Sequence, residues 1–156
     1  MVGVVRLLTI VDLDQAQGPV AAGDVPSASR VSAGDARPGV APSTEQAAPV
    51  GADTISLSAL HLAVLDDGRR LTLLDDRGWG ESGPADIWKL TSVAEIESTA
   101  RMVVGPDDDD ARTVTAHWAH LATVLGTHGV HVDAGQLQLL PHDIELTAQV
   151  RARLAG

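Results

Sequence analysis

The amino-acid composition changes sharply after residue 14, and this change limits which parts of the chain can form a core. Residues 15–53 contain no Leu, Ile, Met or Trp, whereas five of the eight prolines fall there. Such a segment buries too little apolar surface to offset the entropy that is lost when it is ordered. We therefore expect residues 15–53 to form a long flexible insertion inside a single domain that spans residues 1–156.

Apolar segments with strand patterns lie on either side of this insertion. Residues 2–13 are apolar on both sides of an extended chain, which is typical of a strand in the centre of a sheet. Asp67-Gly68 is typical of a two-residue type I′ turn, and it predicts a β-hairpin over residues 54–77 with strands at 55–66 and 69–75. The register of that hairpin would pair Asp66 with Arg69, Val64 with Leu71, and Leu62 with Leu73.

Helix signals dominate residues 91–155. Ser92 and Glu95 stand in the capping-box relation, and the apolar residues Val93, Ile96, Ala100 and Val103 then repeat at helical spacing. The next helix is predicted to follow Asp107–Asp110, because negative charge stabilises the N-terminus of a helix. Its apolar stripe comprises Val114, Trp118, Leu121 and Leu125, so we expect Trp118 to be mostly buried.

The C-terminal segment has two interpretations. Asp133 and Gln136 predict a short helix that runs to Leu140. Residues 141–154 favour a final helix, whereas the alternation in residues 142–146 (HDIEL) also fits a strand. With either ending the patterns predict an α+β fold, in which a small antiparallel sheet of three or more strands packs with three to four C-terminal helices.

The net charge of −10 restricts the classes of partner. Such a chain repels nucleic-acid phosphate and anionic lipid, so we expect neither a nucleic acid nor a membrane as the partner. The apolar N-terminal run is too short to cross a bilayer and no cationic segment precedes it, which favours a cytoplasmic protein. One lysine against ten arginines indicates a GC-rich bacterial genome.

Several catalytic motifs are missing from the sequence. The absence of cysteine excludes disulfides, thiolate catalysis and cysteine-based zinc sites. No nucleophile elbow, P-loop or dinucleotide fingerprint occurs. Asp107–Asp110 do not begin an EF-hand, because Arg112 and Trp118 stand where that loop requires glycine and glutamate.

Four of the six histidines lie within residues 117–133, and His142 follows them. His117 and His120 share one face of the predicted helix, while His128 and His131 lie beyond its end. Together with Asp133 or Asp143, they could supply the nitrogen and oxygen ligands that zinc or another divalent metal accepts. The alternative is that they are surface histidines, and in that case we expect no cofactor.

The stretch LLTIVDLD, residues 7–14, is a second candidate for chemistry. An apolar strand that ends in Asp-x-Asp places Asp12 and Asp14 on the same side of the chain, as phosphotransfer enzymes that use Mg²⁺ require. These residues are similar to the first motif of haloacid-dehalogenase-type phosphatases, which implies a doubly wound fold and Lys89 as the essential lysine. Gln15 and Ala16 depart from the glycine and threonine usual in that family. The alternative is that both carboxylates solvate a strand end.

Acidic clusters near turns and helix starts are candidates for a binding surface. They are Asp66 with Asp67, Asp75 with Asp76, and Asp107–Asp110. Trp79 stands between two glycines in a predicted loop and is a candidate apolar anchor beside them. The alternatives are that the acids maintain solubility and that Trp79 covers a small hydrophobic cluster on the sheet.

Two classes of function follow from these features. The first is a non-catalytic accessory protein of the inhibitor or immunity type, which binds a basic protein partner through its acidic surface. The lack of a complete catalytic motif and the charge of −10 favour it. The alternative is a small metal-dependent enzyme that uses Asp12 and Asp14, or the histidines between His117 and His142.

The composition of the insertion yields a stability prediction. Replacement of residues 15–53 by a short Gly/Ser loop should leave the melting temperature nearly unchanged, because loop entropy grows only slowly with loop length. Thermal unfolding followed by circular dichroism measures this. A large drop in the melting temperature would mean that the insertion packs on the core.

Overall fold

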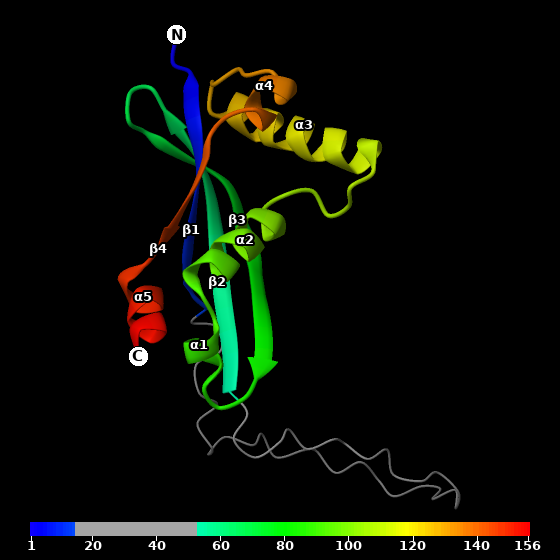
Figure 1. The fold of residues 1–156 in the computed structure, drawn as a ribbon. Coiled ribbons are helices and arrows are strands. Elements are labelled where there is room, and N and C mark those ends of the chain that lie inside the picture. The colour runs from blue at the N-terminus through cyan, green and yellow to red at the C-terminus, as the bar shows by residue number, and fades with distance from the viewer. Residues whose placement is uncertain (15–52) are drawn as a thin grey trace, which may run out of the picture.

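A computed structural model describes residues 1–14 and 53–156 and has an α+β fold, as predicted (Figure 1). The predicted insertion lies outside the described residues, except for Asp53, which begins the second strand. The elements are β1 (Val4–Leu13), β2 (Asp53–Leu65), β3 (Arg70–Gly83), α1 (Ile87–Leu90), α2 (Val93–Val103), α3 (Ala111–Thr127), α4 (Ala134–Gln138), β4 (His142–Leu146) and α5 (Ala148–Ala155).

The four strands form one mixed sheet in the order β3-β2-β1-β4. β1, β2 and β3 pair antiparallel as predicted, but β4 lies parallel to β1, with Leu7 opposite His142 and Val11 opposite Leu146. The favoured helix over residues 141–154 is therefore wrong in its first part, and only α5 remains of it. The alternation explains the difference, because Leu146 is buried while Asp143 and Glu145 are exposed.

The hairpin between β2 and β3 has a three-residue loop instead of the predicted type I′ turn. Gly68 has φ +85 and donates its N–H to the carbonyl of Leu65, and Leu65 donates to the carbonyl of Arg69. This loop needs a positive φ only at its glycine, whereas a type I′ turn needs one at Asp67 as well. The register therefore shifts by one residue from the prediction, and Val64 pairs with Arg70 and Leu62 with Thr72.

β3 continues through the segment that was predicted to be a loop after residue 75. Trp79 pairs with Leu57, and the strand reaches Gly83. Two register shifts occur around His61, where the pairing passes from Leu62 and Thr72 to Ala59 and Arg77. Such bulges leave extra residues on one strand, and here Asp75 and Asp76 fall in the bulged part of β3 with exposed side chains.

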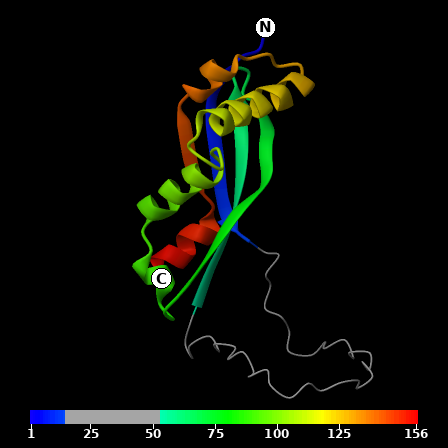
Figure 2. The same cartoon turned by 90° about the vertical axis from the view of Figure 1, so that its right-hand side faces the viewer.

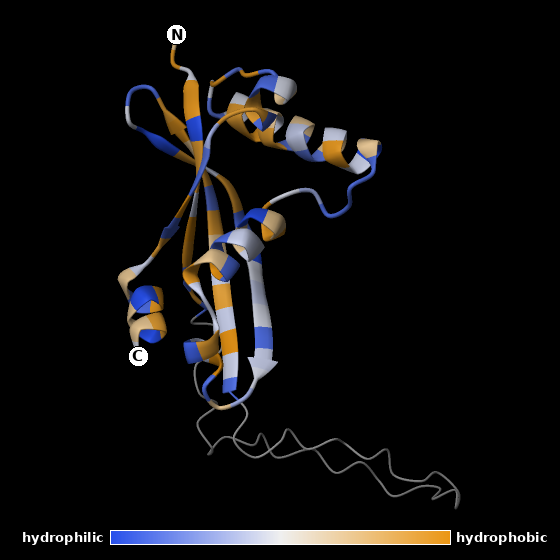
Figure 3. Cartoon of the chain, in the orientation of Figure 1, coloured by the Kyte–Doolittle hydropathy of each residue, from blue (hydrophilic) through white to orange (hydrophobic). Residues whose placement is uncertain are grey.

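The helices pack on one face of the sheet (Figures 1 and 2). Apolar strand residues of that face contact them in two clusters. Figure 3 shows hydrophobic residues in orange along the strands and in the helices. The first cluster joins β1, β2 and β4 to α1, α2 and α5 and includes Val11, Leu57, Ile96 and Val150. The second joins the other end of the sheet to α3 and α4 and includes Leu7, Ala63, Leu65, Leu121, Leu125 and Leu137.

The predicted capping signals fix the ends of the helices. The Ser92 hydroxyl accepts the Glu95 N–H at 3.2 Å, and the Glu95 carboxylate accepts the Ser92 N–H at 2.7 Å, which confirms the capping box. Asp110 and Asp133 cap α3 and α4 through their carboxylates, which accept backbone N–H groups of the first turn without the reciprocal bond of a capping box. Among the described residues, no helix is long and apolar enough to cross a membrane.

The apolar stripe of α3 is confirmed in part. Leu121 and Leu125 are fully buried in the second cluster, whereas Trp118 is only partly buried at its margin. Trp118 lies nearer the N-terminal end of α3 than the two leucines. The core contribution of this helix therefore comes mainly from Leu121 and Leu125.

The exposure of two leucines gives a matched stability prediction. Leu121→Ala should lower the free energy of unfolding by about 2–5 kcal/mol, because a fully buried leucine is replaced by a cavity. Leu139→Ala is the control, since its side chain is 85% exposed, and it should change stability by less than about 0.5 kcal/mol. Urea denaturation measures both values. Similar losses in the two variants would contradict this description of the core.

Candidate functional site

A buried polar cluster joins three neighbouring strands of the sheet, β2, β1 and β4. The Thr9 hydroxyl on β1 lies 2.9 Å from Nδ1 of His61 on β2 and 2.7 Å from Nε2 of His142 on β4. Thr9 and His61 are the buried polar residues of the described core, and the two imidazole rings make an edge contact at 5.1 Å. Three neighbouring strands are therefore connected by side-chain hydrogen bonds inside an otherwise apolar sheet.

The Thr9 hydroxyl determines how protons are arranged in this cluster. A hydroxyl has one proton, so it donates to one ring nitrogen and accepts an N–H from the other. The two rings then complement each other, and neither needs a positive charge to satisfy its bond to Thr9. The backbone carbonyl of His142 also accepts a hydrogen bond from Arg101 on α2 at 3.1 Å, which links the cluster to the helix layer.

Burial keeps this cluster uncharged. Loss of hydration, followed by the nearby His142 and His117, lowers the pKa of His61 to about 3. Burial and the Arg101 guanidinium also lower the pKa of His142, although Asp143 opposes this shift. A low-dielectric site disfavours an imidazolium. Near neutral pH, His61 is therefore a neutral hydrogen-bonding group.

The histidines of the proposed metal group lie in two separate places. His117 is partly buried on α3 near the cluster, and its Nε2 is a buried atom without a hydrogen-bond partner among the described residues. His120 is exposed on the same helix. His128 and His131 line a groove at the other end of α3, roughly 16 Å further along the helix. Within residues 1–14 and 53–156, no group of three His, Asp or Glu side chains is placed to hold a metal ion.

Asp12 and Asp14 lie at the end of β1, where the sequence predicted them. The Asp12 carboxylate accepts hydrogen bonds at 2.8 Å from the Leu13 N–H and from the hydroxyl of Thr147, which caps α5. Asp14 interacts with Ser56 of β2. The mixed sheet differs from the doubly wound fold that the phosphatase resemblance implied, and Lys89 is exposed at the end of α1.

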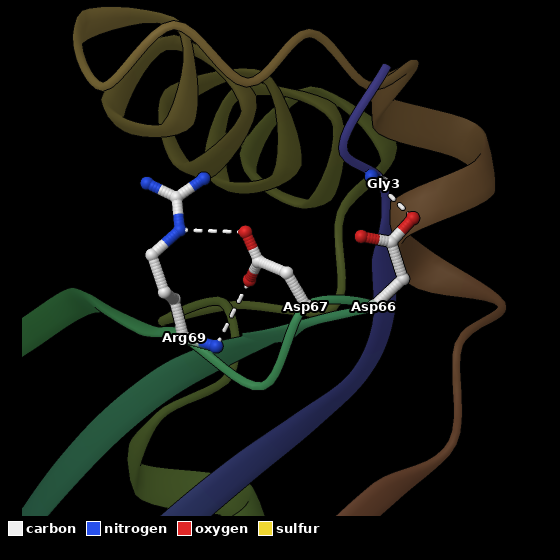
Figure 4. Close-up of polar contacts among 4 residues, drawn as sticks. All are labelled: Gly3, Asp66, Asp67 and Arg69. Carbon is white, nitrogen blue, oxygen red and sulfur yellow. Dashed lines mark hydrogen bonds and ion pairs between the residues drawn. The ribbon is translucent and has the colours of Figure 1, made fainter.

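The acids at the hairpin tip are engaged locally (Figure 4). The Asp66 carboxylate accepts the N–H of Gly3 at 3.1 Å. The Asp67 carboxylate accepts the N–H of Arg69 at 3.0 Å and its guanidinium Nε at 2.7 Å, and these bonds lower the pKa of Asp67. Both acids hold the loop and the N-terminus in position.

The other two acidic clusters are brought together by Arg77. Its guanidinium lies 2.9 Å from Asp107 on the α2–α3 loop and 3.9 Å from Asp76 on β3. Asp75, Asp76 and Asp107–Asp110 are all exposed. We call these six aspartates the acidic ridge. One arginine cannot balance six carboxylates, so the ridge carries a concentrated negative charge next to the edge of the sheet.

Trp79 has a more structural position than the sequence indicated. It lies within β3 instead of a loop, and it packs against the first core cluster while remaining partly exposed. The sequence-based interpretation of Trp79 as a cover for a hydrophobic cluster describes this contact. Trp79 follows the acidic ridge along β3, so the exposed part of its ring lies on the same strand as Asp75 and Asp76.

The sequence reasoning missed Thr9 and His61. The predicted register paired Leu62 with Leu73 and Val64 with Leu71, which made that face of β2 the core side and put His61 on the other face. The helices instead cover the face of β2 that carries His61, Ala63 and Leu65, where His61 lies opposite Thr9. A polar residue in each of two apolar strands was the available signal, because a buried histidine requires a hydrogen-bonding partner.

The low pKa of His61 predicts how stability depends on pH. The His61 side chain takes up a proton near pH 6.5 in the unfolded chain but only near pH 3 in the folded protein. The stability that depends on neutral His61 is therefore complete above about pH 6.5 and is lost as the pH falls below that value. Below pH 6.5, His61 should contribute a slope of roughly 1.4 kcal/mol per pH unit. Urea denaturation between pH 7.5 and 4.5 measures the slope, and NMR titration of the His61 ring measures its pKa directly.

His61→Gln should reduce that slope, and His131→Gln controls for the loss of one histidine at an exposed position. A His61 ring that titrates near 6.5 in the folded protein would contradict its burial.

Comparisons with known proteins give no relative from which a function can be transferred: no family model matches the chain, and neither a curated protein nor a solved structure is significantly similar to it. The described residues carry two features that bear on function, the Thr9–His61–His142 cluster and the exposed acidic ridge.

Proposed function

We propose that this protein is a non-catalytic binding protein of the inhibitor or immunity type, and that it binds a basic protein partner through the acidic ridge. The observation that carries the proposal is the ion pairing of Arg77 with both Asp76 and Asp107. Through it, acids separated by about thirty residues in the sequence form one surface.

The strength of the ridge comes from its composition and exposure. Six carboxylates on neighbouring segments create a local potential that attracts cationic groups and orients an approaching partner. Asp107 and Asp110 keep their charge near neutral pH, because hydrogen bonds from Arg77 lower the pKa of Asp107 and those from Thr113 lower the pKa of Asp110. Because the acids are exposed, carboxylate oxygens that accept no hydrogen bond within the chain remain accessible to a partner.

The histidine cluster serves a structural role in this proposal. Thr9, His61 and His142 satisfy one another's hydrogen bonds, and both His61 and His142 have lowered pKa values caused first by burial. A general base would need to reach a substrate within hydrogen-bonding distance. Thr9 and His61 are at most 1% exposed, so the cluster stabilises the sheet that carries the ridge.

Charge reversal in the ridge tests the proposal. Asp75→Lys/Asp109→Lys should weaken capture of basic proteins from a lysate of the source organism by about tenfold, because both charges lie at the centre of the attraction. Asp86→Lys/Glu97→Lys makes the same change in net charge away from the ridge, at residues whose side chains make no hydrogen bond or ion pair in the described structure, and should bind like wild type. Quantitative pull-downs measure both.

Salt provides the second arm of this test. Raising the ionic strength from about 0.1 M to about 1 M shortens the screening length from about 10 Å to about 3 Å and should release the partner. A partner that is retained equally by both double variants and at both salt concentrations would refute the role of the ridge.

A further inference from the structure

The outer edge of β3 has free backbone N–H and C=O groups. The hydrogen-bond pattern of the sheet shows which residues carry them. The Ser56 carbonyl accepts the N–H of Asp14, so the backbone groups of Ser56 face β1. In an antiparallel ladder neighbouring residues face opposite sides, so Leu57 and its partner Trp79 bond to each other. The N–H and C=O groups of the alternate residues Gly78, Gly80 and Ser82 therefore point away from β2.

The two edges of the sheet differ in whether their outward backbone groups have hydrogen-bond partners. At the β4 edge, Arg101 donates to the carbonyl of His142 and Arg151 donates to the carbonyl of Leu146, each at 3.1 Å, and the strand has only five residues. β3 has fourteen residues, and no described residue donates to or accepts from the outward backbone groups of Gly78, Gly80 and Ser82. Long unpaired edges are templates for a further strand.

The fold requires glycine at one position of β3 but not at another. A Cβ at Gly78 would lie 2.6 Å from the Leu57 carbonyl oxygen, so the fold requires glycine there. At Gly80 the nearest atom would be the Ile55 carbonyl oxygen at an ordinary 3.5 Å, so packing does not require glycine. A strand glycine that packing does not require is typical of a site where another backbone approaches closely.

Two grooves follow this edge on the side that carries α2. One, of about 420 Å³, is lined by Asp76, Gly78, Met102, Pro106 and Asp107. The other, of about 510 Å³, is lined by Glu81, Gly83, Ile87, Leu90 and Thr99 among others. One groove is lined by residues 76–78 of β3 and the other by residues 81–83, so two side chains on one face of an added strand, at positions i and i+4, can enter them.

We infer that the edge of β3 from Gly78 to Ser82 binds an extended segment of the partner as an additional β-strand. The segment has a basic residue that enters the groove beside Asp76 and Asp107, and an aliphatic residue that enters the groove beside Ile87 and Leu90. Backbone hydrogen bonds supply affinity in this binding mode, and alternate side chains supply specificity. This inference rests on the proposed function and names the form in which the basic partner is recognised.

Charge complementarity selects a basic segment over a second copy of this chain. An antiparallel pair of β3 edges centred on Gly78 would place Asp75 of one copy opposite Glu81 of the other. Like charges directly opposite each other destabilise a strand pair. A segment with arginine or lysine meets the same acids with the opposite charge.

The experiment uses two short synthetic peptides and the full-length protein. Each peptide has threonine at alternate positions, with arginine and leucine about four positions apart on the other face. Their order is reversed between the two peptides so that both strand directions are tested. Calorimetry gives dissociation constants for the wild type and for a matched pair of variants, Gly80→Ala, which keeps the outward N–H, and Gly80→Pro, which removes it.

At least one peptide should bind, and Gly80→Pro should bind it about fivefold more weakly than Gly80→Ala, as expected for the loss of one hydrogen bond. A peptide N-methylated at alternate residues should bind the wild-type protein at least about fivefold more weakly than the unmethylated peptide. This comparison tests the same hydrogen bonds without altering the protein. Hydrogen exchange at the amides of Gly78 and Ser82 should slow when the peptide binds.

Equal affinities for both Gly80 variants and both forms of the peptide, or no binding of either peptide, would overturn strand addition. If Asp75→Lys/Asp109→Lys still abolished capture of the basic partner in that case, the acidic ridge would remain the binding surface. Peptide binding that depends on Gly80 but not on the ridge would instead contradict the proposed function.

Discussion

The position of β1 between β2 and β4 is the constraint on which the rest of the structure depends. β1 is paired on both sides, and its alternate residues Leu7, Thr9 and Val11 face the helices. The Thr9 hydroxyl holds a histidine from each neighbouring strand, so β2, β1 and β4 are connected by side chains as well as by the backbone. β1 and β2 are paired on both sides, which leaves β3 and β4 as the edges of the sheet.

The two edges then differ because of which side chains the helices bring to them. α2 and α5 carry Arg101 and Arg151, whose guanidinium groups satisfy carbonyls of β4. The loop after α2 brings Asp107 to the other edge, where Arg77 of β3 binds it. The guanidinium groups of the helices thus close one edge, while the loop makes the other edge acidic and leaves its backbone open. The two edges of one four-stranded sheet therefore have different surfaces.

Much of the fold could be predicted from the sequence, because the relevant signals are local. The capping box of Ser92 and Glu95 and the caps at Asp110 and Asp133 depend on spacings of a few residues, and all are present. The hairpin register could not be obtained in this way, since Asp67-Gly68 is compatible with loops of two and three residues. The one-residue difference changed which face of the hairpin was expected to be the core side, so His61 was expected on the wrong side of the sheet. The acidic ridge likewise depends on a contact between Arg77 and Asp107, and no sequence spacing indicates that contact.

The acids beside β3 counteract the tendency of an open strand edge to pair with other chains. The outer edge of β3 is unpaired, and Gly78, Gly80 and Gly83 give it little side-chain bulk to prevent pairing with another copy or with unrelated chains. Charged residues on and beside an edge discourage such pairing, and Asp75, Asp76 and Glu81 provide that charge here. In the proposed binding mode, the same carboxylates attract the basic side chains of an added strand, so that repulsion is replaced by attraction. Under this proposal, one set of charges discourages pairing with another copy and selects a basic partner, and neutralising those charges would remove both properties together.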